Sequence, residues 1–577
     1  MTLRALLLAA AVALAAPPGA TVAQAPAEPP GQPFLRVDPG FHTQIVNRVA
    51  TDGEGRIAAT ASDDKTIRLW SVADGRALST IRVPIAEGDQ EGEIYAVAIS
   101  PDGATLLAGG HTGWAWDRAF CLYLFDVVNQ RLRGRLPRLP APINHIAYSA
   151  DGKRFALALG GRAGIRVHDA TSGQLLFADD DFADRATAVA FAGDGRLAAT
   201  GFDGAVRLYA PDGKRVARRE LKGGRPYGLA FARDGRTIAV GMIDAPRVEL
   251  LAGRDLKPVR TLRVDGGGGL AAVAWARDGR LLAGGSVRDR GGAVAVMAWP
   301  ASLKGAPQAW PVAQDTVSDI EPLPDGGALV ASADPALVLV SKDGRAVAGR
   351  GGLTFDLREV GERRLALSAD GTVLDLHPRG APRPLRIDLG QRRIGEAEGP
   401  LDGTRTLVPV RAPPTEPLRV ASWRNEPRPT LIGRPLALDP EELARSQAIT
   451  ADQRFLLLGT DYFLRVYRAD GSLAARLRTP GTAWGVTVAR DGRTVAAALG
   501  DGTLRWYGLA SDGTLEERVA VVLATDLRRW IAWTPEGFFD HAVLGGKELV
   551  GYHLNRGRAE LADWLSFALV YRLFYAP

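Results

Sequence analysis

Apolar and polar positions alternate in short runs along most of this chain. In Thr66-Ile67-Arg68-Leu69-Trp70, the alternation places Ile67 and Leu69 on one face and Arg68 on the other. The stretch 97–108 has an apolar run, an Asp-Gly turn and a second run of small apolar residues. A period of two residues bounded by turn residues predicts β-strands rather than helices.

The Asp-Gly turns recur at nearly regular intervals. They are Asp52-Gly53, Asp102-Gly103, Asp151-Gly152, Asp194-Gly195, Asp234-Gly235, Asp278-Gly279 and Asp325-Gly326, spaced 50, 49, 43, 40, 44 and 47 residues apart. A tight turn needs a residue at positive φ, which glycine adopts at little steric cost. A period of about 40–45 residues built from short strands is typical of the blades of a β-propeller.

The repeat divides the chain into two parts. Seven units beginning near Val46, Ile94, Ile143, Ala186, Pro226, Leu270 and Val317 fill residues 34–345. Degraded units begin near Leu353, Ile394, Ser446, Ala483 and Trp530, and we assign 346–557 to a second propeller. The predicted fold is all-β, with two tandem propellers, the first seven-bladed and the second six- or seven-bladed, and a short C-terminal helix within 558–577. One very large ring is the weaker alternative, because blade counts typically run from about 4 to 8.

The N-terminus has the pattern of an export signal. Arg4 precedes the apolar stretch 5–16, small residues follow, and 1–23 is therefore predicted to be a cleavable signal peptide. Residues 24–33 form a Pro-rich tether. We expect a periplasmic or secreted protein without a membrane span, since twelve apolar residues are too few to cross a bilayer.

One unit resembles a complete WD40 repeat. His42, Ser62, Asp64 and Trp70 stand where WD40 repeats have a structural network of hydrogen bonds. The indole N–H of a buried tryptophan needs an acceptor, so we expect Ser62 and His42 to connect Trp70 with Asp64. A Ser-His-Asp set also suggests a hydrolase, but the spacing favours the structural role.

Two apolar segments are candidates for an interaction surface. The insertion 109–118 carries Trp114 and Trp116, and the predicted helix 559–575 carries an apolar stripe that includes Trp564, Phe567 and Tyr571. For both segments we favour packing against the protein's own propeller over contact with a partner chain. Membrane contact of the helix is the weakest alternative.

No motif in the sequence predicts catalysis or a cofactor. Lys and Arg number 71 against 65 Asp and Glu, and the basic residues form no dense cluster, so nucleic-acid binding is not expected. No metal-binding or nucleophile motif is present, and Cys121 lies in an apolar run that predicts a buried thiol. The acidic segment 179–184 is predicted to be a solvated loop, with calcium binding as the alternative. We therefore expect no catalytic residue, no metal and no cofactor.

The segments Thr534-Pro535-Glu536-Gly537 and His553-Leu554-Asn555-Arg556-Gly557 are more distinctive than the blades. With them, residues 36–575 resemble exported bacterial WD40-repeat proteins that carry a C-terminal caspase-like peptidase domain. The peptidase residues of that family map onto no position of this sequence. The resemblance therefore implies a relative without the peptidase.

These observations predict a non-enzymatic WD40-repeat scaffold in the cell envelope that binds proteins. Its partner would be a caspase-like peptidase or another periplasmic protein. The alternatives are a propeller that binds a small ligand or a glycan, and a propeller enzyme of the quinoprotein or hydrolase type.

Overall fold

The computed structural model describes residues 28–86, 90–358, 360, 365–398, 407–409, 418–439 and 442–574. The predicted signal peptide, residues 24–27 of the tether, the side chain of Tyr571 and all of Tyr575 lie outside the described residues. Nearly all of the regular secondary structure in the described chain is β-strand, which confirms the predicted all-β fold. No helix in the described ranges is both long and apolar enough to cross a membrane.

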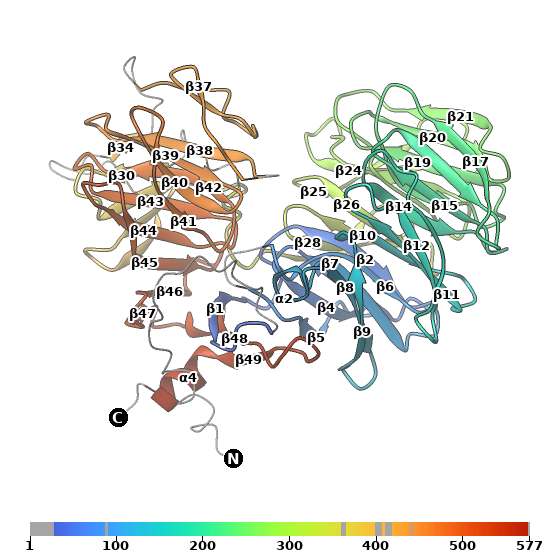
Figure 1. The fold of residues 1–577 in the computed structure, drawn as a ribbon, viewed down its shortest axis with the longest axis horizontal. Helices are drawn as coiled ribbons and strands as arrows, with labels where there is room; N and C mark the ends of the chain where they lie inside the picture. Colours follow the sequence, from blue (N-terminus) through green and yellow to red (C-terminus); the bar gives the residue numbers. More distant parts are fainter. Residues whose placement is uncertain are drawn as a thin grey trace, which may run out of the picture.

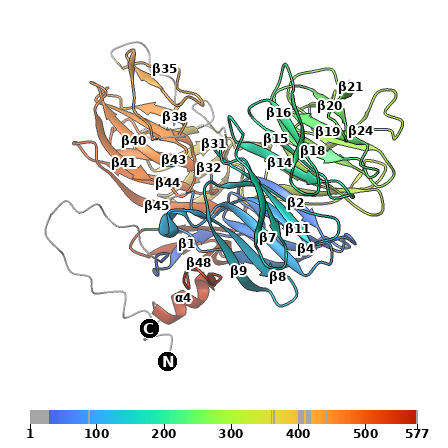
Figure 2. The same ribbon diagram turned by 45° about the vertical axis from the view of Figure 1, so that its right-hand side comes forward.

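Residues 46–351 form seven four-stranded antiparallel sheets, each from consecutive strands, and we call this part the first propeller (Figures 1 and 2). The strands of the first four sheets are β2 Val46–Thr51, β3 Ile57–Ser62, β4 Thr66–Ser71, β5 Ala77–Arg82; β6 Glu93–Ile99, β7 Thr105–His111, β8 Phe120–Asp126, β9 Arg131–Leu139; β10 Ile143–Tyr148, β11 Arg154–Leu159, β12 Ile165–Asp169, β13 Leu175–Asp179; β14 Ala186–Phe191, β15 Leu197–Gly201, β16 Ala205–Tyr209 and β17 Arg215–Glu220. Those of the last three are β18 Pro226–Phe231, β19 Thr237–Met242, β20 Arg247–Ala252, β21 Pro258–Arg263; β22 Ala272–Trp275, β23 Leu281–Gly284, β24 Val294–Trp299, β25 Gln308–Ala313; β26 Val317–Pro322, β27 Ala328–Ser332, β28 Ala336–Val340 and β29 Ala346–Gly351.

The first and seventh sheets are neighbours, so the ring is closed. Thr51 Oγ1 donates to Glu321 Oε1 at 2.7 Å, and the amide of Val49 donates to Asp319 Oδ2 at 3.1 Å. A cluster of buried side chains, including Phe41, Val46, Trp70, Leu329 and Leu337, fills the space between these two sheets. The structure therefore agrees with the seven blades predicted for this part.

Most inner strands carry a β-bulge near their first residue, and the side chain at the bulge reaches the next blade. Asn47 donates to the carbonyl of Ile94, Asn144 to that of Ala186, Thr187 to that of Tyr227, and Ser318 to that of Val46. A bulge turns a side chain away from the regular alternation. These polar contacts therefore connect neighbouring blades around the centre of the ring.

The Asp-Gly turns have the expected backbone at six of the seven positions. Gly103, for example, has φ +75°. Gly53 differs, because a Cβ atom there would lie 2.7 Å from the carbonyl oxygen of Pro101. At this turn glycine is needed for close approach to the neighbouring blade and not for a positive φ.

Residues 365–541, which we call the second region, are less regular. The sheets are β30 Leu365–Ser368, β31 Val373–Leu376, β32 Leu385–Asp388, β33 Arg393–Glu396 with β34 Leu407–Pro409; β35 Val420–Ala421, β36 Thr430–Leu431, β37 Arg434–Pro435; β38 Ala444–Ile449, β39 Phe455–Thr460, β40 Phe463–Arg468, β41 Leu473–Arg478; and β42 Ala483–Val488, β43 Thr494–Leu499, β44 Leu504–Leu509, β45 Leu515–Leu523, β46 Trp530–Trp533 and β47 Phe539–His541. The sheet of β30–β34 packs against that of β42–β47 through a shared core.

The second region shows four sheets among its described residues, where we expected six or seven blades. The segments near Ile394 and Trp530 were expected to begin new blades. Instead, Ile394 lies on β33, at the edge of the sheet that begins at β30, and Trp530 begins β46, which pairs with β45. Apolar strands at the edge of an existing sheet have the same sequence pattern as the first strand of a blade.

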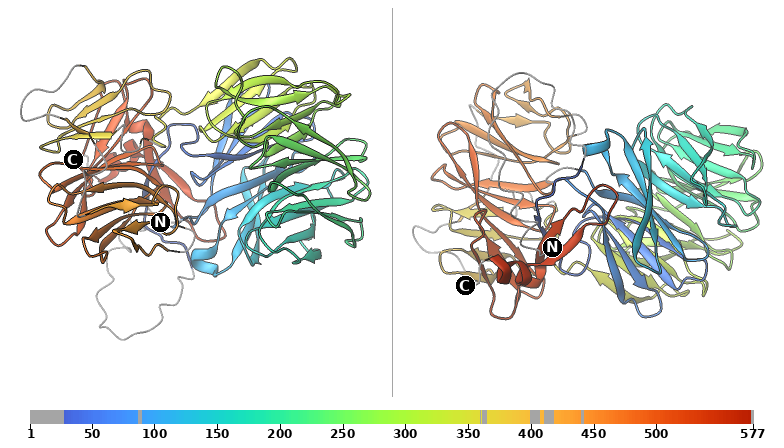
Figure 3. Two further views of the ribbon diagram at one scale, coloured as in Figure 1. Left: turned by 90° about the horizontal axis from the view of Figure 1, so that it is seen from above. Right: turned by 60° about the horizontal axis from the view of Figure 1, so that its bottom comes forward.

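The two ends of the described chain come together in a third arrangement. Strand β1, Phe34–Val37, pairs with β48, Val550–Leu554, which pairs with β49, Asp563–Ser566. Figure 3 shows these C-terminal strands beside β1, where the first propeller and the second region meet. The turn η2, Lys547–Leu549, leads into β48, and α4, Phe567–Phe574, follows β49.

This arrangement corrects two expectations. Strand β1 was assigned to the first propeller within 34–345, but it belongs to the sheet made with the C-terminal segment. The helix predicted over 559–575 begins only at Phe567, because 563–566 is extended and pairs with β48. The apolar spacing of 559–575 suits a helix, but the edge of β48 offers strand pairing to its first part.

Candidate interaction sites

The polar network in the first blade is present, but a different hydroxyl completes it. His42 Nδ1 lies 2.8 Å from Asp64 Oδ2, and its Nε2 lies 2.8 Å from Thr60 Oγ1. Trp70 donates its indole N–H to the same Thr60 hydroxyl at 2.9 Å. With the Nδ1–H tautomer, these contacts form an unbroken chain from Trp70 to Asp64.

Ser62 was expected to connect Trp70 with His42, and this prediction is wrong. Its hydroxyl donates to the carbonyl of Gln44 at 3.3 Å and accepts the amide of Asp64. Ser62 is the last residue of β3, and Thr60 lies two residues earlier on the same strand, level with Arg68 on β4. Thr60 and Ser62 are two residues apart on β3, so both hydroxyls fit the spacing of the network in the sequence. The pairing of β3 with β4 decides which hydroxyl contacts Trp70.

The network holds a charged carboxylate inside the blade. Burial alone would raise the pKa of Asp64, but the contacts with His42 and Arg68 outweigh it and hold that pKa well below its usual range. His42, Thr60 and Trp70 are at most 3% exposed. The chain is therefore almost closed to solvent, which favours a structural role, although His42 borders the cavity described below.

A buried arginine in the third strand recurs in several blades, and the alternation in 66–70 predicts only that Arg68 lies on the face opposite Ile67 and Leu69. Arg68 pairs with Asp38 at 2.6 Å, Arg207 with Asp203 at 2.5 Å, and Arg465 with Glu442 at 2.6 Å. Each of these arginines is at most 3% exposed. The recurring pattern of an arginine between two apolar residues, before a closing aromatic residue, was the available signal.

The tryptophan loop packs largely on the first propeller. Trp116 is 4% exposed, so it is not part of an interaction surface. Trp114, at the start of the short helix α2 (Trp114–Asp117), stacks on Phe120 at 5.3 Å but remains 41% exposed. Glu91 accepts the backbone N–H groups of Gly113 and Ala115, which fixes the loop.

The C-terminal residues also pack internally. Phe567 is 5% exposed and lies against the rings of Phe539 and Tyr552. Trp564 is half-buried on β49, with the guanidinium of Arg82 4.2 Å from its ring centre. Both residues were candidates for an interaction surface, and both instead attach the C-terminal segment to the rest of the molecule.

The distinctive 553–557 segment has the same role. Asn555 accepts the amide of Ile85 at 3.0 Å and donates to the carbonyls of Ile85 and Pro30. His553 lies 3.0 Å from the Asn555 side-chain oxygen. We call this segment, together with β1, β48 and β49, the terminal clasp.

An apolar groove lies between the edge of the β30–β34 sheet and strands β45–β47. Its volume is about 400 Å³, and Trp530, Val521 and Ile394 are among the residues that line it. The turn 534–537 closes the hairpin of β46 and β47, with the amide of Gly537 donating to the carbonyl of Thr534. Phe538 follows this turn at the rim of the groove and is 76% exposed.

Two further apolar side chains are exposed close by in the sequence, although neither lines the groove. Val543 is 100% exposed and Leu544 is 71% exposed, in the turn that follows β47. Exposed apolar groups that cluster beside a groove are characteristic of binding surfaces, whereas isolated ones are common on any protein. We call Phe538, Val543, Leu544 and the groove the apolar surface.

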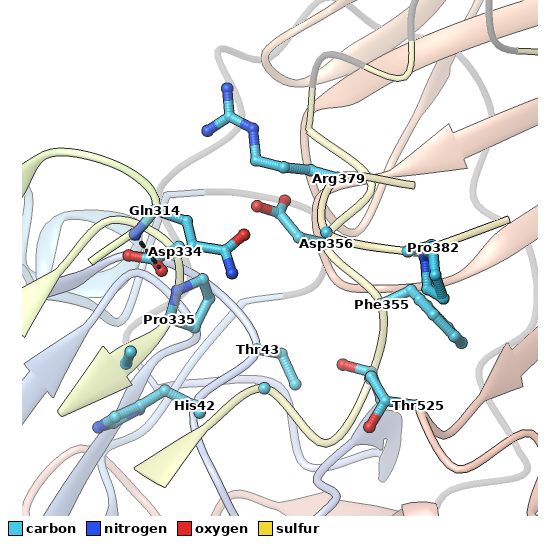
Figure 4. A pocket seen from close by; sticks show the side chains of 16 residues that line it. His42, Thr43, Gln314, Asp334, Pro335, Phe355, Asp356, Arg379, Pro382 and Thr525 are labelled. Carbon is cyan, nitrogen blue, oxygen red and sulfur yellow. Dashed lines mark hydrogen bonds between the residues drawn. The ribbon is translucent and has the colours of Figure 1, made fainter. Parts of the chain in front are cut away.

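A second cavity, which we call the junction cavity, lies where the first propeller meets the second region (Figure 4). Its volume is about 340 Å³. Thr43, Gln314 and Asp334 line it from the first propeller, and Phe355, Asp356, Arg379 and Thr525 line it from the other side. In Figure 4 the carboxylate of Asp356 points toward Gln314 and Asp334.

Ion pairs beside the junction cavity connect its two walls. Asp315 pairs with Arg379 at 2.6 Å and with Arg358 at 3.2 Å, and Arg358 also pairs with Asp356 at 2.7 Å. The guanidinium groups of Arg358 and Arg379 thus have Asp315 and Asp356, and not only Asp334, as neighbouring carboxylates.

The acidic segment 179–184 and Cys121, the remaining candidates from the sequence, have structural surroundings. In the acidic segment, Asp180 pairs with Arg166, and Asp179 and Asp181 pair with Arg215. Among the described residues, no group of three or more His, Cys, Asp or Glu could hold a metal ion. Cys121 is fully buried in β8, which confirms the predicted buried thiol, and burial raises its pKa.

Comparison with known proteins supports the WD40 assignment of the first blade. Residues 39–71 match the family model described as "WD domain, G-beta repeat". This match spans His42, Thr60, Asp64 and Trp70, the four residues of the network. The chain thus contains a WD40 repeat within an all-β fold of propeller blades.

Three curated relatives come from eukaryotes, and one of them is named as a WD-repeat protein. WD repeat-containing protein SL1-17 of Schistosoma mansoni is 29% identical over 185 residues, 32% of this chain and 53% of that protein. Protein HIR1 of Cryptococcus neoformans is 32% identical over 93 residues, 14% of this chain and 11% of that protein. The Drosophila virilis "Ribosome biogenesis protein BOP1 homolog" is 40% identical over 53 residues, 9% of this chain and 7% of that protein.

The chain thus spans about half the length of the first of these relatives and far less of the other two. None of the three names denotes an enzyme or refers to a caspase-like peptidase. The resemblance to exported bacterial proteins therefore remains an expectation.

Proposed function

We propose that this WD40-repeat protein is a non-enzymatic scaffold of the cell envelope that binds another protein through its apolar surface. The exposure of Phe538 at the rim of an apolar groove, together with the exposed Val543 and Leu544 in the turn that follows β47, supports this function. Buried aromatic anchors surrounded by polar groups dominate the energy of most interfaces. The groove, with a volume of about 400 Å³ and an apolar lining, offers a place for such an anchor, and Phe538 supplies another.

The partner would present apolar side chains to the groove. Arg392 and Asp540, which lie 3.7 Å apart and are largely exposed, stand at the mouth of the groove and would contribute to a polar rim. A caspase-like peptidase or another periplasmic protein is the proposed partner. This part of the proposal rests on the resemblance of the 534–537 and 553–557 segments.

Site-specific photocrosslinking in the native host tests the surface. A photoreactive phenylalanine at position 538 should yield a crosslinked species that mass spectrometry can identify. The same residue at position 128 is the matched control, because Val128 is 79% exposed but belongs to the first propeller, between β8 and β9. Equal crosslinking at 538 and 128, or none at 538, would argue against the apolar surface as the binding site.

Export is tested separately. N-terminal sequencing of protein recovered from the periplasm or the medium should begin at Gln24 or Pro26. Recovery of the protein only from the cytoplasm, with Met1 retained, would remove the cell-envelope location but leave the binding surface open to test.

A further inference from the structure

We propose that the partner binds the apolar surface as an added β-strand, an extended segment that pairs with the outer edge of β33 and inserts a large apolar side chain into the groove. This inference rests on the proposed function and specifies how the partner is held. An added strand gains affinity from main-chain hydrogen bonds, and specificity from pockets that receive alternate side chains. The outer edge of β33 and the groove beside it supply these two features.

The first observation is the unpaired edge of β33. This strand is the last in its sheet, and no described strand pairs with its outer side. The amide of Ala397 donates to the carbonyl of Pro384 at 2.8 Å, in register with the pairs of β32 and β33. Hydrogen-bonded and non-hydrogen-bonded pairs alternate in an antiparallel ladder. The backbone N–H and C=O groups of Ile394 and Glu396 therefore point away from β32, toward the position of a further strand.

The second observation is the position of the groove beside this edge. Ile394 lines the groove, and so does Ile387, which lies directly opposite it on β32. Trp530 and Val521 of the neighbouring sheet line the groove from the other side. Residues directly opposite one another in adjacent strands have their side chains on the same face of a sheet. In an added strand, the residue opposite Ile394 would therefore direct its side chain into the groove, whose volume is about 400 Å³.

The third observation is the charge at this edge. Arg393, the first residue of β33, is exposed and forms no ion pair with the described residues. Asp388 lies opposite it in the register, but the carboxylate of Asp388 accepts the amide of Gln391 at 2.8 Å. Glu396, at the other end of β33, pairs with Arg383 at 3.0 Å. The uncompensated charge along β33 is thus positive, and an acidic residue opposite Arg393 in the added strand would be stabilising.

These observations define the segment that the partner supplies. It is extended, it carries an aromatic or long aliphatic side chain opposite Ile394, and an acidic residue stands next to that side chain in its sequence. A helix or a folded surface would also place an apolar side chain in the groove, but it would leave the backbone of β33 unused. The experiment therefore has to separate use of the backbone at this edge from use of the groove alone.

The crosslinking at position 538 in the native host is repeated with Glu396→Pro and Glu396→Ala. Proline removes the N–H that points away from β32, and proline is tolerated at such positions of an edge strand. Both variants should therefore have the same melting temperature. The yield of the crosslinked species should fall about tenfold with Glu396→Pro, because the added strand loses a backbone donor and meets the proline ring, and it should be unchanged with Glu396→Ala.

A charge variant tests the same edge without changing the backbone. Arg393→Glu should lower the yield about fivefold, because it places a like charge opposite the acidic residue of the partner. Arg162→Glu is the matched control, since Arg162 is an exposed arginine of the first propeller, and it should leave the yield unchanged. This pair of variants decides the question even where Glu396→Pro does not fold.

The outcomes separate this inference from the proposed function. No crosslinking at position 538 in the native background would remove the apolar surface as a binding site, and the added strand with it. Equal yields in the native protein, Glu396→Pro and Glu396→Ala would leave the proposed function intact and overturn strand addition, in favour of a helix or a folded surface. Equal losses with Glu396→Pro and Glu396→Ala, or a yield unchanged by Arg393→Glu, would also overturn the proposal.

Discussion

The first propeller and the second region use the same strand pattern, but they close in different ways. The seam of the first propeller combines an apolar cluster with polar contacts from Asp319 and Glu321. The corresponding contact in the second region is an apolar core shared by the β30–β34 and β42–β47 sheets, with Leu367, Leu374 and Ala498 at its centre.

The difference shows what makes a blade regular. In the first propeller every sheet has four consecutive strands, and side chains at the bulges connect four of the seven inner strands to the next blade. In the second region one sheet has six strands and another three. Among the described residues, strands added at a sheet edge, such as β46 and β47, extend a blade beyond four strands.

Deleting the part of the terminal clasp after Gly557 should have the largest effect on stability. The truncation removes Phe567, which is 5% exposed, together with the pairing of β49 and the contact of Trp564 with Arg82. We expect a loss of about 5 kcal/mol. Because the clasp lies where the two parts meet, calorimetry should show two separate unfolding transitions in place of one.

A point variant tests the same clasp without truncation. Asn555→Ala removes the three hydrogen bonds to Ile85 and Pro30 and should destabilise in the same direction by about 2 kcal/mol. A single transition with unchanged melting temperature in both variants would show that the clasp does not couple the two parts.

Removing the buried ion pair of the second region should have the next largest effect. Glu442 is 0% exposed and pairs with Arg465, and it also accepts a hydrogen bond from Thr460. Glu442→Ala leaves the Arg465 guanidinium buried without its main partner, which should cost about 3–5 kcal/mol. Urea denaturation gives the value, and hydrogen exchange should place the loss in 444–478.

Glu516→Ala is the matched control for that pair. Glu516 pairs with Arg518, but both side chains are more than 60% exposed. Exposed pairs contribute about 0–1 kcal/mol. Equal losses of unfolding free energy in the two variants would mean that the Glu442–Arg465 pair is effectively solvated. Burial of this pair would then not make it more important to stability than an exposed pair.

The fold of the first propeller was predictable because its strands and turns follow a regular local sequence pattern. The Asp-Gly spacing and the alternation around Arg68 predicted the seven blades of the first propeller, and the structure agrees. Blade units of the second region were harder to assign, because an apolar edge strand such as 530–533 has the same pattern as an inner strand. Only tertiary pairing distinguishes these two positions.

The sites were less predictable than the fold. Three of the four network residues were identified, but the choice between Ser62 and Thr60 depends on a register that spacing does not determine. Trp116 and Phe567 were candidates for a surface, yet both are buried, because apolar composition does not say which surface covers a residue. Asp334 and Asp356 line the junction cavity from two parts of the chain, and no local motif predicts that they share it.

Thr60→Val tests the network in the first blade at nearly constant volume. Valine removes the hydroxyl that accepts from Trp70 and contacts His42, and so leaves two buried groups without a partner. We expect a loss of about 2 kcal/mol, measured by chemical denaturation. Thr261→Val, at an exposed hydroxyl that donates to Glu249, should change stability by less than about 0.5 kcal/mol.

The outcome shows whether Thr60 or Ser62 supplies the hydroxyl that connects Trp70 with His42. If Thr60→Val and Thr261→Val have the same effect, the hydroxyl of Thr60 is not essential to the network. If Ser62→Ala proves more costly than Thr60→Val, the arrangement of hydrogen bonds in the structure is wrong.

The smallest expected effect concerns pH and the seam of the first propeller. Burial, with a smaller contribution from the neighbouring Asp319, raises the pKa of Glu321 from 4.5 to about 7. The folded state therefore binds the Glu321 proton more tightly than the unfolded state does. This contribution to stability is fully present below about pH 4.5 and is lost as the pH rises to about 7.

Glu321→Gln keeps an oxygen that can accept from Thr51 Oγ1 and removes the titration. The variant should thus gain stability relative to the native protein between these pH values, by roughly 1 kcal/mol because Glu321 is half-buried. Denaturation of both proteins at pH 5 and pH 8 measures the gain. Hydrogen exchange should place the gain at 46–51 and 317–322, with no change at the apolar seam of the second region.

A difference in stability between the two proteins that is the same at both pH values would show that Glu321 keeps an ordinary pKa. The polar seam would then not make the first propeller more sensitive to pH than the second region.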